Sequence, residues 1–279
     1  LRPCLPTSPL PSPSSTYSLS SPYLSSLVSC SRITNPSWQQ DVRHCVFSYP
    51  SSSPSSPPAP APTPYSPGDV VCILPSNPPS NALSFLAHLS LSPSLILTSI
   101  TPVDSHDKRW AHVPLPISLL SFVTHYLDIQ GHPRRLFFRH ISTLTDNEIE
   151  KEKLAHFSSA EGQGDLRLYN QKEGRTFLEV LEDFRYVKMS LEEVLTVLPP
   201  LKPRKFSISS SLSLFPDQIH VTLAVVEYTT PLNRTRKGLC SHFLSTLPVG
   251  SEVRIWVEKG AIRLPPPGSN IIAVGPGTG

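Results

Sequence analysis

Two short segments, far apart in the chain, carry residue types that could bind a phosphorylated aromatic cofactor. The first is Arg204-Lys205-Phe206-Ser207. Its guanidinium offers the fixed donors that suit a phosphate, its phenyl ring could lie against a flat heterocycle, and its hydroxyl could reach a ring nitrogen. The same residues also fit an ordinary strand start with a surface arginine, so the motif indicates chemistry only together with others.

The second segment, Gly238-Leu239-Cys240-Ser241, stands before an apolar stretch that is typical of a helix. Glycine permits close backbone approach, and Ser241 occupies the place where we expect the helix N-cap. Free N–H groups at a helix start bind anions, so a pyrophosphate could rest here, with the backbone N–H of Cys240 mattering more than its sulfur. An ordinary capped helix is the alternative.

A third motif, Gly275-Pro276-Gly277-Thr278-Gly279, follows the apolar run 271–274. A strand followed by a glycine-rich turn is how α/β dinucleotide folds present amide groups to phosphate. We therefore expect a strand at 271–274 and a nucleotide-phosphate loop after it. The loop differs from Gly-x-Gly-x-x-Gly, and any glycine-proline turn after a strand is the alternative.

No other group of residues in the sequence predicts catalysis or a metal site. The cysteines form no Cys-x-x-Cys pair and no zinc spacing, so we expect reduced thiols of a cytosolic protein at Cys4, Cys30, Cys45, Cys72 and Cys240. The net charge of +3 is too small to indicate nucleic acid or a membrane surface. No apolar run approaches the roughly 20 residues that cross a bilayer, and the start does not resemble a signal peptide.

The elements that must position these motifs change along the chain from strands to helices and back to strands. β-branched runs predict strands at 41–47, 69–74, 219–228 and 253–257, the second of them after a Pro67-Gly68 turn. Helical periodicity covers about 118–199, with capping boxes expected at Thr145-x-x-Glu148 and Ser190-x-x-Glu193. The 33 prolines are too many for one compact domain, and we interpret the Ser/Pro-rich tracts at 1–21 and 48–67 as a disordered linker and loop.

Taken together and in this order, the motifs resemble the diflavin reductase family, which includes cytochrome P450 reductase. The segment 204–207 is similar to the family's Arg-x-[Tyr/Phe]-Ser signature, 238–241 to its Gly-x-x-[Ser/Thr], and Tyr126-Leu127-Asp128-Ile129 to the start of its helical connecting region. The resemblance implies an α+β fold: an antiparallel FAD-binding β-barrel with a helical connecting insertion, ending at the first strand of a Rossmann-like NADP-binding domain. It implies an FAD-binding domain at 22–268, with barrel parts at 22–110 and 200–268, an insert at 111–199, and the NADP-binding domain from 269.

The resemblance also implies a role for each motif in an enzyme that passes electrons from NADPH to FAD, then to FMN and an acceptor protein. Arg204 would bind the FAD pyrophosphate, Phe206 would stack on the flavin, and Ser207 would be catalytic through a hydrogen bond near N5. Tyr228 would lie near the adenosine half. The full cofactor-binding set is Arg204, Lys205, Phe206, Ser207, Tyr228, Gly238, Leu239, Cys240, Ser241, Gly275, Gly277, Thr278 and Gly279.

Three features resemble the cytosolic branch of the family that serves iron–sulfur cluster assembly: Gly-Leu-Cys-Ser at 238–241, phenylalanine at Phe206, and the stretch 151–159. That branch implies the iron–sulfur protein anamorsin as a candidate acceptor. One departure is Gly174, where the family often has the first of two arginines and only Arg175 is retained here. An FMN-binding domain is expected upstream, and we expect the chain alone to bind FAD without turning over NADPH.

Two rival interpretations remain open. One keeps the enzyme class and changes the acceptor, to cytochromes P450 or to sulfite reduction. The other, from a different class, is a Ser/Pro-rich interaction protein with a β-barrel module and no flavin; the two Ser/Pro tracts favour it, and a colourless purified protein would support it.

Overall fold

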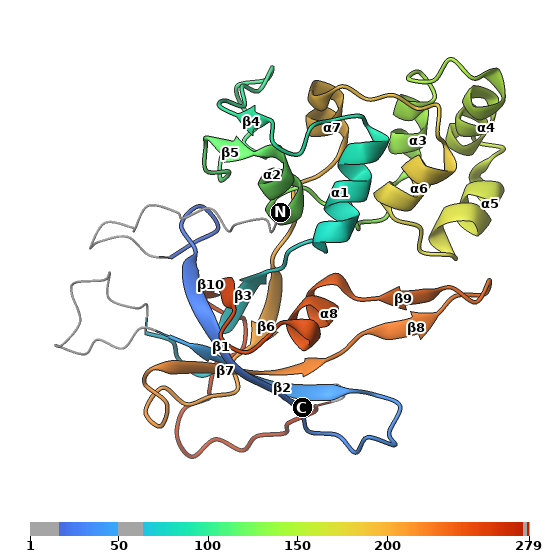
Figure 1. Ribbon diagram of the computed structural model, residues 1–279. Helices are drawn as coiled ribbons and strands as arrows, with labels where there is room; N and C mark the ends of the chain where they lie inside the picture. The colour runs from blue at the N-terminus through green and yellow to red at the C-terminus, as the bar shows by residue number, and fades with distance from the viewer. Residues whose placement is uncertain (1–16, 50–63, 276–277, 279) are drawn as a thin grey trace. The chain divides into compact units, whose positions relative to one another are not determined.

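An antiparallel sheet in the strand order β6-β3-β10-β1-β2-β7 organises one part of the molecule (Figure 1). The structure is a computed structural model that describes residues 17–49, 64–275 and 278. The strands are Tyr23–Arg32 (β1), Val42–Ser48 (β2), Val70–Leu74 (β3), Arg204–Ser207 (β6), Gln218–Ala224 (β7) and Glu252–Glu258 (β10). β2, β3, β7 and β10 form where the sequence predicted strands, because β-branched residues pack well on a pleated, half-buried surface. β1 was not predicted.

The sheet curls but does not close into the barrel that we expected. β1 pairs with β10 through residues 23–26 and then with β2, with a bulge between Leu27 and Ser29; bulges bend a strand and increase its twist. Within the described residues, one bridge joins the two edge strands, between Ile208 and Val221. The α+β class is confirmed, and the contact between the two edges is limited to an isolated bridge rather than a ladder.

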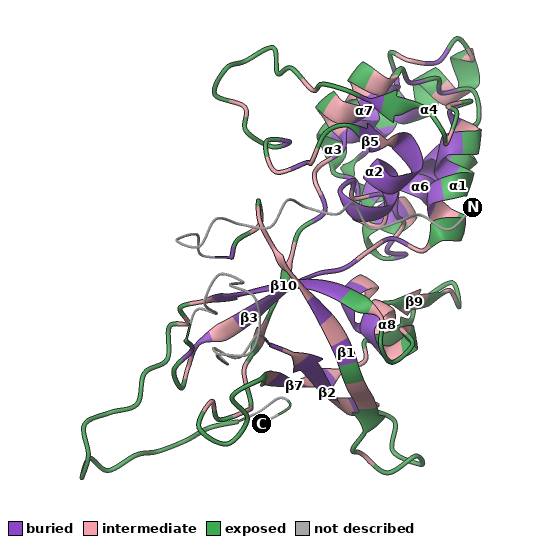
Figure 2. Ribbon diagram, turned by 60° about the vertical axis from the view of Figure 1, so that its left-hand side comes forward, coloured by how far each residue is buried: buried purple, intermediate pink, exposed green. Residues whose placement is uncertain are grey.

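The sheet and the helix α8, Leu239–Thr246, share one apolar core. Side chains on one face of the strands alternate inward, as a period of two requires, and β10 is buried along most of its length (Figure 2). The buried members of this core are Leu27, Cys45, Phe47, Tyr49, Tyr65, Val71, Ile73, Ile219, Val221, Leu223, Cys240, Leu244, Val253, Ile255 and Val257. This packing fixes α8 against the sheet.

A turn at Pro67-Gly68 leads into β3, as predicted. Gly68 has φ +89°, and a Cβ there would lie 2.0 Å from the Ile262 carbonyl oxygen, so only glycine fits. The next residue, Asp69, is shielded from solvent and accepts hydrogen bonds from Lys259 Nζ and the Ser66 N–H, each at 2.9 Å. These contacts, the lysine first, lower the pKa of Asp69 to about 2.

Of the described residues, a second compact unit comprises 76–201 and 227–236, and the sheet unit comprises 17–49, 64–75, 202–226, 237–275 and 278. The second unit is mostly helical. Its elements are α1 (Pro79–His88), β4 (Ile96–Leu97), β5 (Ile117–Ser118), α2 (Leu119–His125), α3 (Arg135–Ile141), α4 (Glu148–Ser158), α5 (Gln163–Leu166), the π-helical η1 (Arg167–Gln171), α6 (Phe177–Asp183) and α7 (Leu191–Val197). The short strands β8 (Glu227–Thr229) and β9 (Thr235–Lys237) pair with each other.

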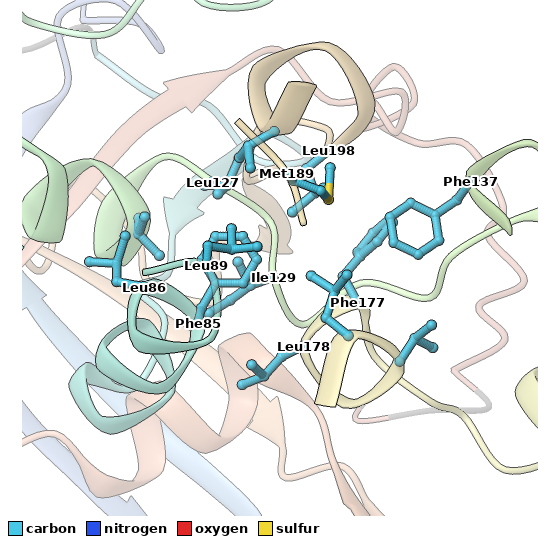
Figure 3. Close-up of a cluster of buried hydrophobic side chains, with 14 of the residues drawn as sticks. Phe85, Leu86, Leu89, Leu127, Ile129, Phe137, Phe177, Leu178, Met189 and Leu198 are labelled. Atoms are coloured by element: carbon cyan, nitrogen blue, oxygen red, sulfur yellow. The ribbon is translucent and has the colours of Figure 1, made fainter. Parts of the chain in front are cut away.

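An aromatic-rich core holds the helices of this unit together. Phe85, Phe122 and Phe138 are completely buried, and Figure 3 shows Phe137 beside Phe177, whose ring centroids are 4.9 Å apart in an edge-to-face arrangement. Such pairs contribute about 0.5–1.5 kcal/mol beyond the burial of their area. These buried side chains form one apolar core that the helices of this unit share.

Helix starts agree with the sequence at one predicted cap and differ at another. The capping box of Ser190 and Glu193 is formed. The box expected at Thr145 is wrong: α4 begins at Glu148, and its cap is Asn147, whose side chain accepts from the Glu150 N–H at 3.0 Å. Asparagine caps as well as threonine or better, and Asn147, rather than Thr145, stands directly before the first residue of the helix.

Other predictions differ from the structure or lie outside it. α1 lies within the stretch 22–110 that we assigned to the barrel, and the mostly helical compact unit includes residues from 76 onward; the bounds of the insert, 111–199, stay a prediction. Residues 271–274 form no strand, and Ile272 is 94% exposed; a strand needs a hydrogen-bonding neighbour, and none in the described residues pairs with this run. Most of the linker 1–21 and of the loop 48–67 lies outside the described residues.

Candidate functional site

The strand β6 presents its four residues alternately to the two faces of the sheet edge. Arg204 pairs with Ile73 and Phe206 with Val71, and both partners face the core that α8 shares. Because directly paired residues lie on the same face, Arg204 and Phe206 face the side of α8. Lys205 and Ser207 face the other side.

Arg204 is an exposed cation with most of its donors uncommitted. Among the described residues, its Nη1 donates to the carbonyl of Lys202 at 2.9 Å, and no carboxylate pairs with it. Phe206 is half-buried and packs against the core of the sheet unit. An unpaired guanidinium beside an aromatic ring is a suitable donor set for a phosphate attached to a flat ring system.

Lys205 differs from Arg204 because it already has a partner. Its Nζ lies 2.6 Å from Glu258 Oε2 on β10, and this contact raises the pKa of Lys205 and lowers that of Glu258. The ammonium group of Lys205 is therefore held by Glu258 on the face of the sheet that points away from α8. Ser207 is exposed at the end of β6.

The start of α8 offers backbone donors, although not through the cap that we expected. The N-cap is Gly238 and no side chain caps the helix. Ser241 lies inside the helix, where its Oγ accepts from the Val226 N–H at 3.1 Å and donates to the Gly238 carbonyl at 3.1 Å. The prediction of Ser241 as N-cap is wrong, because its hydroxyl binds the Val226 N–H, between β7 and β8, and leaves the first amides of the helix without a side-chain acceptor.

Gly238 is required at this place by space rather than by backbone conformation. Its φ of −67° suits any residue. A Cβ on it would lie 2.7 Å from Ser241 Oγ and 2.8 Å from Val226 Cβ, closer than real contacts. A side chain here would push the start of α8 away from the sheet.

Arg204 and the start of α8 lie close enough to interact electrostatically. Burial raises the pKa of the Cys240 thiol to about 12, and the positive charge of Arg204 lowers it in part. Phe206 and Cys240 also belong to the same apolar core. The two motifs, 204–207 and 238–241, thus lie on the same side of the sheet unit and pack against the same core.

The remaining predicted positions lie elsewhere. Tyr228, on β8 in the helical unit, is 50% exposed. Gly275 and Thr278 are exposed, and Gly277 and Gly279 lie outside the described residues. The described residues contain no group of three or more His, Cys, Asp or Glu side chains that could hold a metal ion.

The arginine retained after Gly174 is engaged inside the helical unit. The Arg175 guanidinium lies over the ring of Tyr169, 4.3 Å from its centroid, and pairs with Asp183. Gly174 itself has φ +55°, in the left-handed region that favours glycine. The departure from the family pattern at this position therefore coincides with a backbone conformation in which an arginine would be strained.

A buried polar network that the sequence analysis missed fastens the β8–β9 hairpin to the helical unit. Glu173 accepts from the Thr230 hydroxyl at 2.7 Å and from the Leu232 N–H at 3.2 Å. Arg236 Nε donates to the Glu173 carbonyl at 2.7 Å, and its Nη1 donates to Glu179 at 2.7 Å. The two glutamates lie more than 50 positions from their partners in the hairpin, so no local sequence motif indicates the network.

Comparison with known proteins decides the family. The family described as "FAD binding domain" matches residues 16–243, most of the chain. The chain belongs to the FAD-binding domain family. In this FAD-binding domain, the matched region includes both 204–207 and 238–241.

Curated relatives of this FAD-binding domain are named NADPH-dependent diflavin oxidoreductase 1. The chain is 42% identical to the one from Dictyostelium discoideum over 265 residues, which cover 92% of the chain and 41% of the relative. It is 40% identical to those from Danio rerio (92% of the chain, 43% of the relative) and Arabidopsis thaliana (88% and 39%). The chain thus spans about two fifths of the length of these relatives.

The helices in the described ranges are too short or too polar for any one of them to traverse a bilayer.

Proposed function

We propose that the chain is the FAD-binding module of an NADPH-dependent diflavin reductase. The observation that carries the proposal is that an unpaired Arg204 and the uncapped start of α8 lie on the same side of the sheet unit. The similarity to NADPH-dependent diflavin oxidoreductases over about nine tenths of the chain supports it.

The donors at this place fit the pyrophosphate of a dinucleotide. Arg204 supplies a permanent charge with several N–H groups, and the amides of Leu239 and Cys240 supply the partial positive charge of a helix start. Each phosphate of a pyrophosphate carries a negative charge, so both donors have a partner of the right sign. We assign Arg204 and the amides of 238–241 to holding this linkage.

The edge position of β6 suits the flavin ring. Phe206 would lie against the ring, and the exposed Ser207 hydroxyl would donate a hydrogen bond near N5, the catalytic role that we assign to it. When bound, FAD would supply the redox chemistry: the flavin accepts a hydride and passes its two electrons on one at a time. The protein residues orient the ring and limit its access to water.

The other contacts belong to parts of the site that the two motifs do not reach. We assign Tyr228 to the adenosine half, and Thr278 with Gly275, Gly277 and Gly279 to the phosphates of NADP. Lys205 is expected to contribute less than its neighbours, because Glu258 already pairs with its ammonium group.

The whole reductase would use NADPH, FAD and FMN and deliver electrons to an acceptor protein in the cytoplasm. We assign the protein to the branch that serves iron–sulfur cluster assembly, as the resemblance of 151–159, Phe206 and 238–241 implies, with anamorsin as the acceptor. Reduction of purified anamorsin by the full-length protein and NADPH, without reduction of a cytochrome P450 or of sulfite, is the expected result. The opposite preference would move the protein to a P450 reductase-like or sulfite reductase-like branch.

The proposal is tested by loading the purified chain with flavins. After incubation with FAD and gel filtration, we expect a yellow protein that releases stoichiometric FAD on denaturation. FMN is the matched control: it lacks the adenosine half and the pyrophosphate, so it should be lost on the column. A protein that stays colourless with FAD would contradict the proposal and favour the Ser/Pro-rich interaction protein.

A further inference from the structure

Two cysteines stand directly opposite each other in the sheet unit. Cys30 on β1 is the register partner of Cys45 on β2, and their Sγ atoms are 2.8 Å apart. Paired residues in antiparallel strands have Cα atoms roughly 4.5–5.5 Å apart, within the roughly 4.4–6.8 Å that disulfides span. The backbone therefore already has the geometry of a cross-strand disulfide while both thiols are free.

The two thiols have different surroundings. Cys45 is completely buried, whereas Cys30 is half-buried and accessible from outside the core. Arg43, two residues before Cys45, directs its guanidinium to Asp41, to the Ser245 carbonyl and to Cys30. A cation beside an accessible sulfur favours its thiolate form.

The chemical asymmetry follows from these contacts. The Cys45 thiol donates a hydrogen bond that lowers the pKa of Cys30, and the charge of Arg43 lowers it further. The same hydrogen bond, together with burial, raises the pKa of Cys45. Cys30 is thus the nucleophile of the pair. Cys45 is the resolving thiol: it stays protonated until Cys30 has formed a mixed disulfide, which Cys45 then attacks.

We propose that Cys30 and Cys45 are a redox-active dithiol that exchanges with small-molecule disulfides and forms a reversible disulfide between β1 and β2. This site is separate from the flavin function and does not depend on it. The sequence analysis expected only scattered reduced thiols, because a spacing of 15 residues has no meaning until the register of the two strands is known.

The exchange takes place in two balanced steps. The Cys30 thiolate attacks one sulfur of a disulfide such as oxidised glutathione, forms a mixed disulfide and releases one thiolate. Cys45 then attacks Cys30 Sγ, the second glutathione leaves as the thiol after taking up the Cys45 proton, and the protein disulfide closes. Two protein thiols are oxidised, one small-molecule disulfide is reduced to two thiols, and excess reduced glutathione reverses both steps.

The other described cysteines lack this arrangement. Burial, the larger cause, and the neighbouring Glu258 carboxylate raise the pKa of Cys72 to about 12. Burial also raises the pKa of Cys240 to about 12. Among the described residues, neither lies within hydrogen-bond distance of another cysteine sulfur. Both are expected to stay reduced under conditions that oxidise the pair.

Thiol counting by intact mass tests the proposal. The reduced flavin-free chain is equilibrated in buffers of increasing oxidised-to-reduced glutathione ratio, quenched in acid, denatured and labelled with N-ethylmaleimide. We expect the wild-type chain to lose two labels together, without retaining glutathione, and to regain both with dithiothreitol. A chain that keeps all its labels at the most oxidising ratio would overturn the proposal.

Single variants identify the pair. Cys30→Ser should lose no pair of labels, and Cys45→Ser should accumulate one glutathione on Cys30, the trapped first step. Cys45→Ala serves if the buried serine prevents folding, and Cys72→Ser should behave like the wild type. Loss of two labels in Cys30→Ser would show that other cysteines pair and would also overturn the proposal, whether or not the chain binds FAD.

Discussion

Two arginines, one in each compact unit, have opposite surroundings. In the sheet unit, Arg204 is exposed, and its Nη1 contact with the Lys202 carbonyl leaves the rest of its fork open. In the helical unit, Arg236 has a side chain only 13% exposed and donates to the Glu173 carbonyl and to Glu179. The same side chain is available for a ligand in one place and holds a hairpin in the other.

This difference teaches that residue type alone does not identify a binding site. A guanidinium that is desolvated against a carboxylate contributes to stability, because removing it would leave the carboxylate unpaired. One that keeps its donors open contributes little to folding and can contribute to binding. Partner contacts, rather than sequence motifs, separate the two roles.

The largest folding effect expected from this comparison is that of Arg236→Met. The change leaves Glu179 half-buried with its main partner removed, although burial opposes its charged form. We expect a loss of about 2–3 kcal/mol in the free energy of unfolding, measured by urea denaturation and by faster hydrogen exchange at 227–237. Arg167→Met, an exposed arginine of the same unit, should stay within about 0.5 kcal/mol; equal effects would break the comparison.

Asp69 shows that the sheet unit also contains a buried charge that contributes to stability, because its carboxylate pairs with Lys259. Its folded pKa of about 2 lies below the unfolded value of about 3.9. The ionised Asp69 therefore contributes fully to the free energy of unfolding above pH ~4, and this contribution disappears as the pH falls to ~2. We expect an effect of about 1–2 kcal/mol after allowance for its exposed partner Lys259. Acid unfolding curves should show this slope for the wild type and lose it in Asp69→Asn; an unchanged slope would contradict the assignment.

A smaller effect is expected at Gly174, where the family pattern has arginine. With φ +55°, a Cβ here is strained and would lie 3.3 Å from the Tyr228 hydroxyl. Gly174→Ala should reduce stability by about 1 kcal/mol, as measured by thermal unfolding. Gly164→Ala is the matched control, since nothing lies within 4 Å of its Cβ position in α5; this change should be neutral or stabilising.

Much of the architecture could be predicted because its signals are local. The strands β2, β3, β7 and β10 and the cap at Ser190 follow from period-two runs and a capping box. α1 was missed although Ala82, Phe85, Leu86 and Leu89 have helical spacing and proline suits a helix start.

The parts that could not be predicted depend on contacts between distant residues. Ser241 was expected to cap α8, but its hydroxyl binds Val226 and Gly238 instead. The Glu173 network and the Cys30–Cys45 pair likewise depend on the register of strands and the docking of a hairpin. The two FAD motifs were found because a family resemblance, not spacing, connects them.

The most direct test of the account compares FAD binding by Arg204→Ala and by Lys205→Ala, two neighbours on β6. Losing the open guanidinium should cost about 1.5–3 kcal/mol of binding, a weakening of roughly 10- to 100-fold by isothermal titration, with unfolding of the flavin-free chain unchanged. Lys205→Ala should weaken FAD less than about fivefold, because Glu258 holds its charge on the other face. Unchanged FAD affinity in Arg204→Ala would contradict the account.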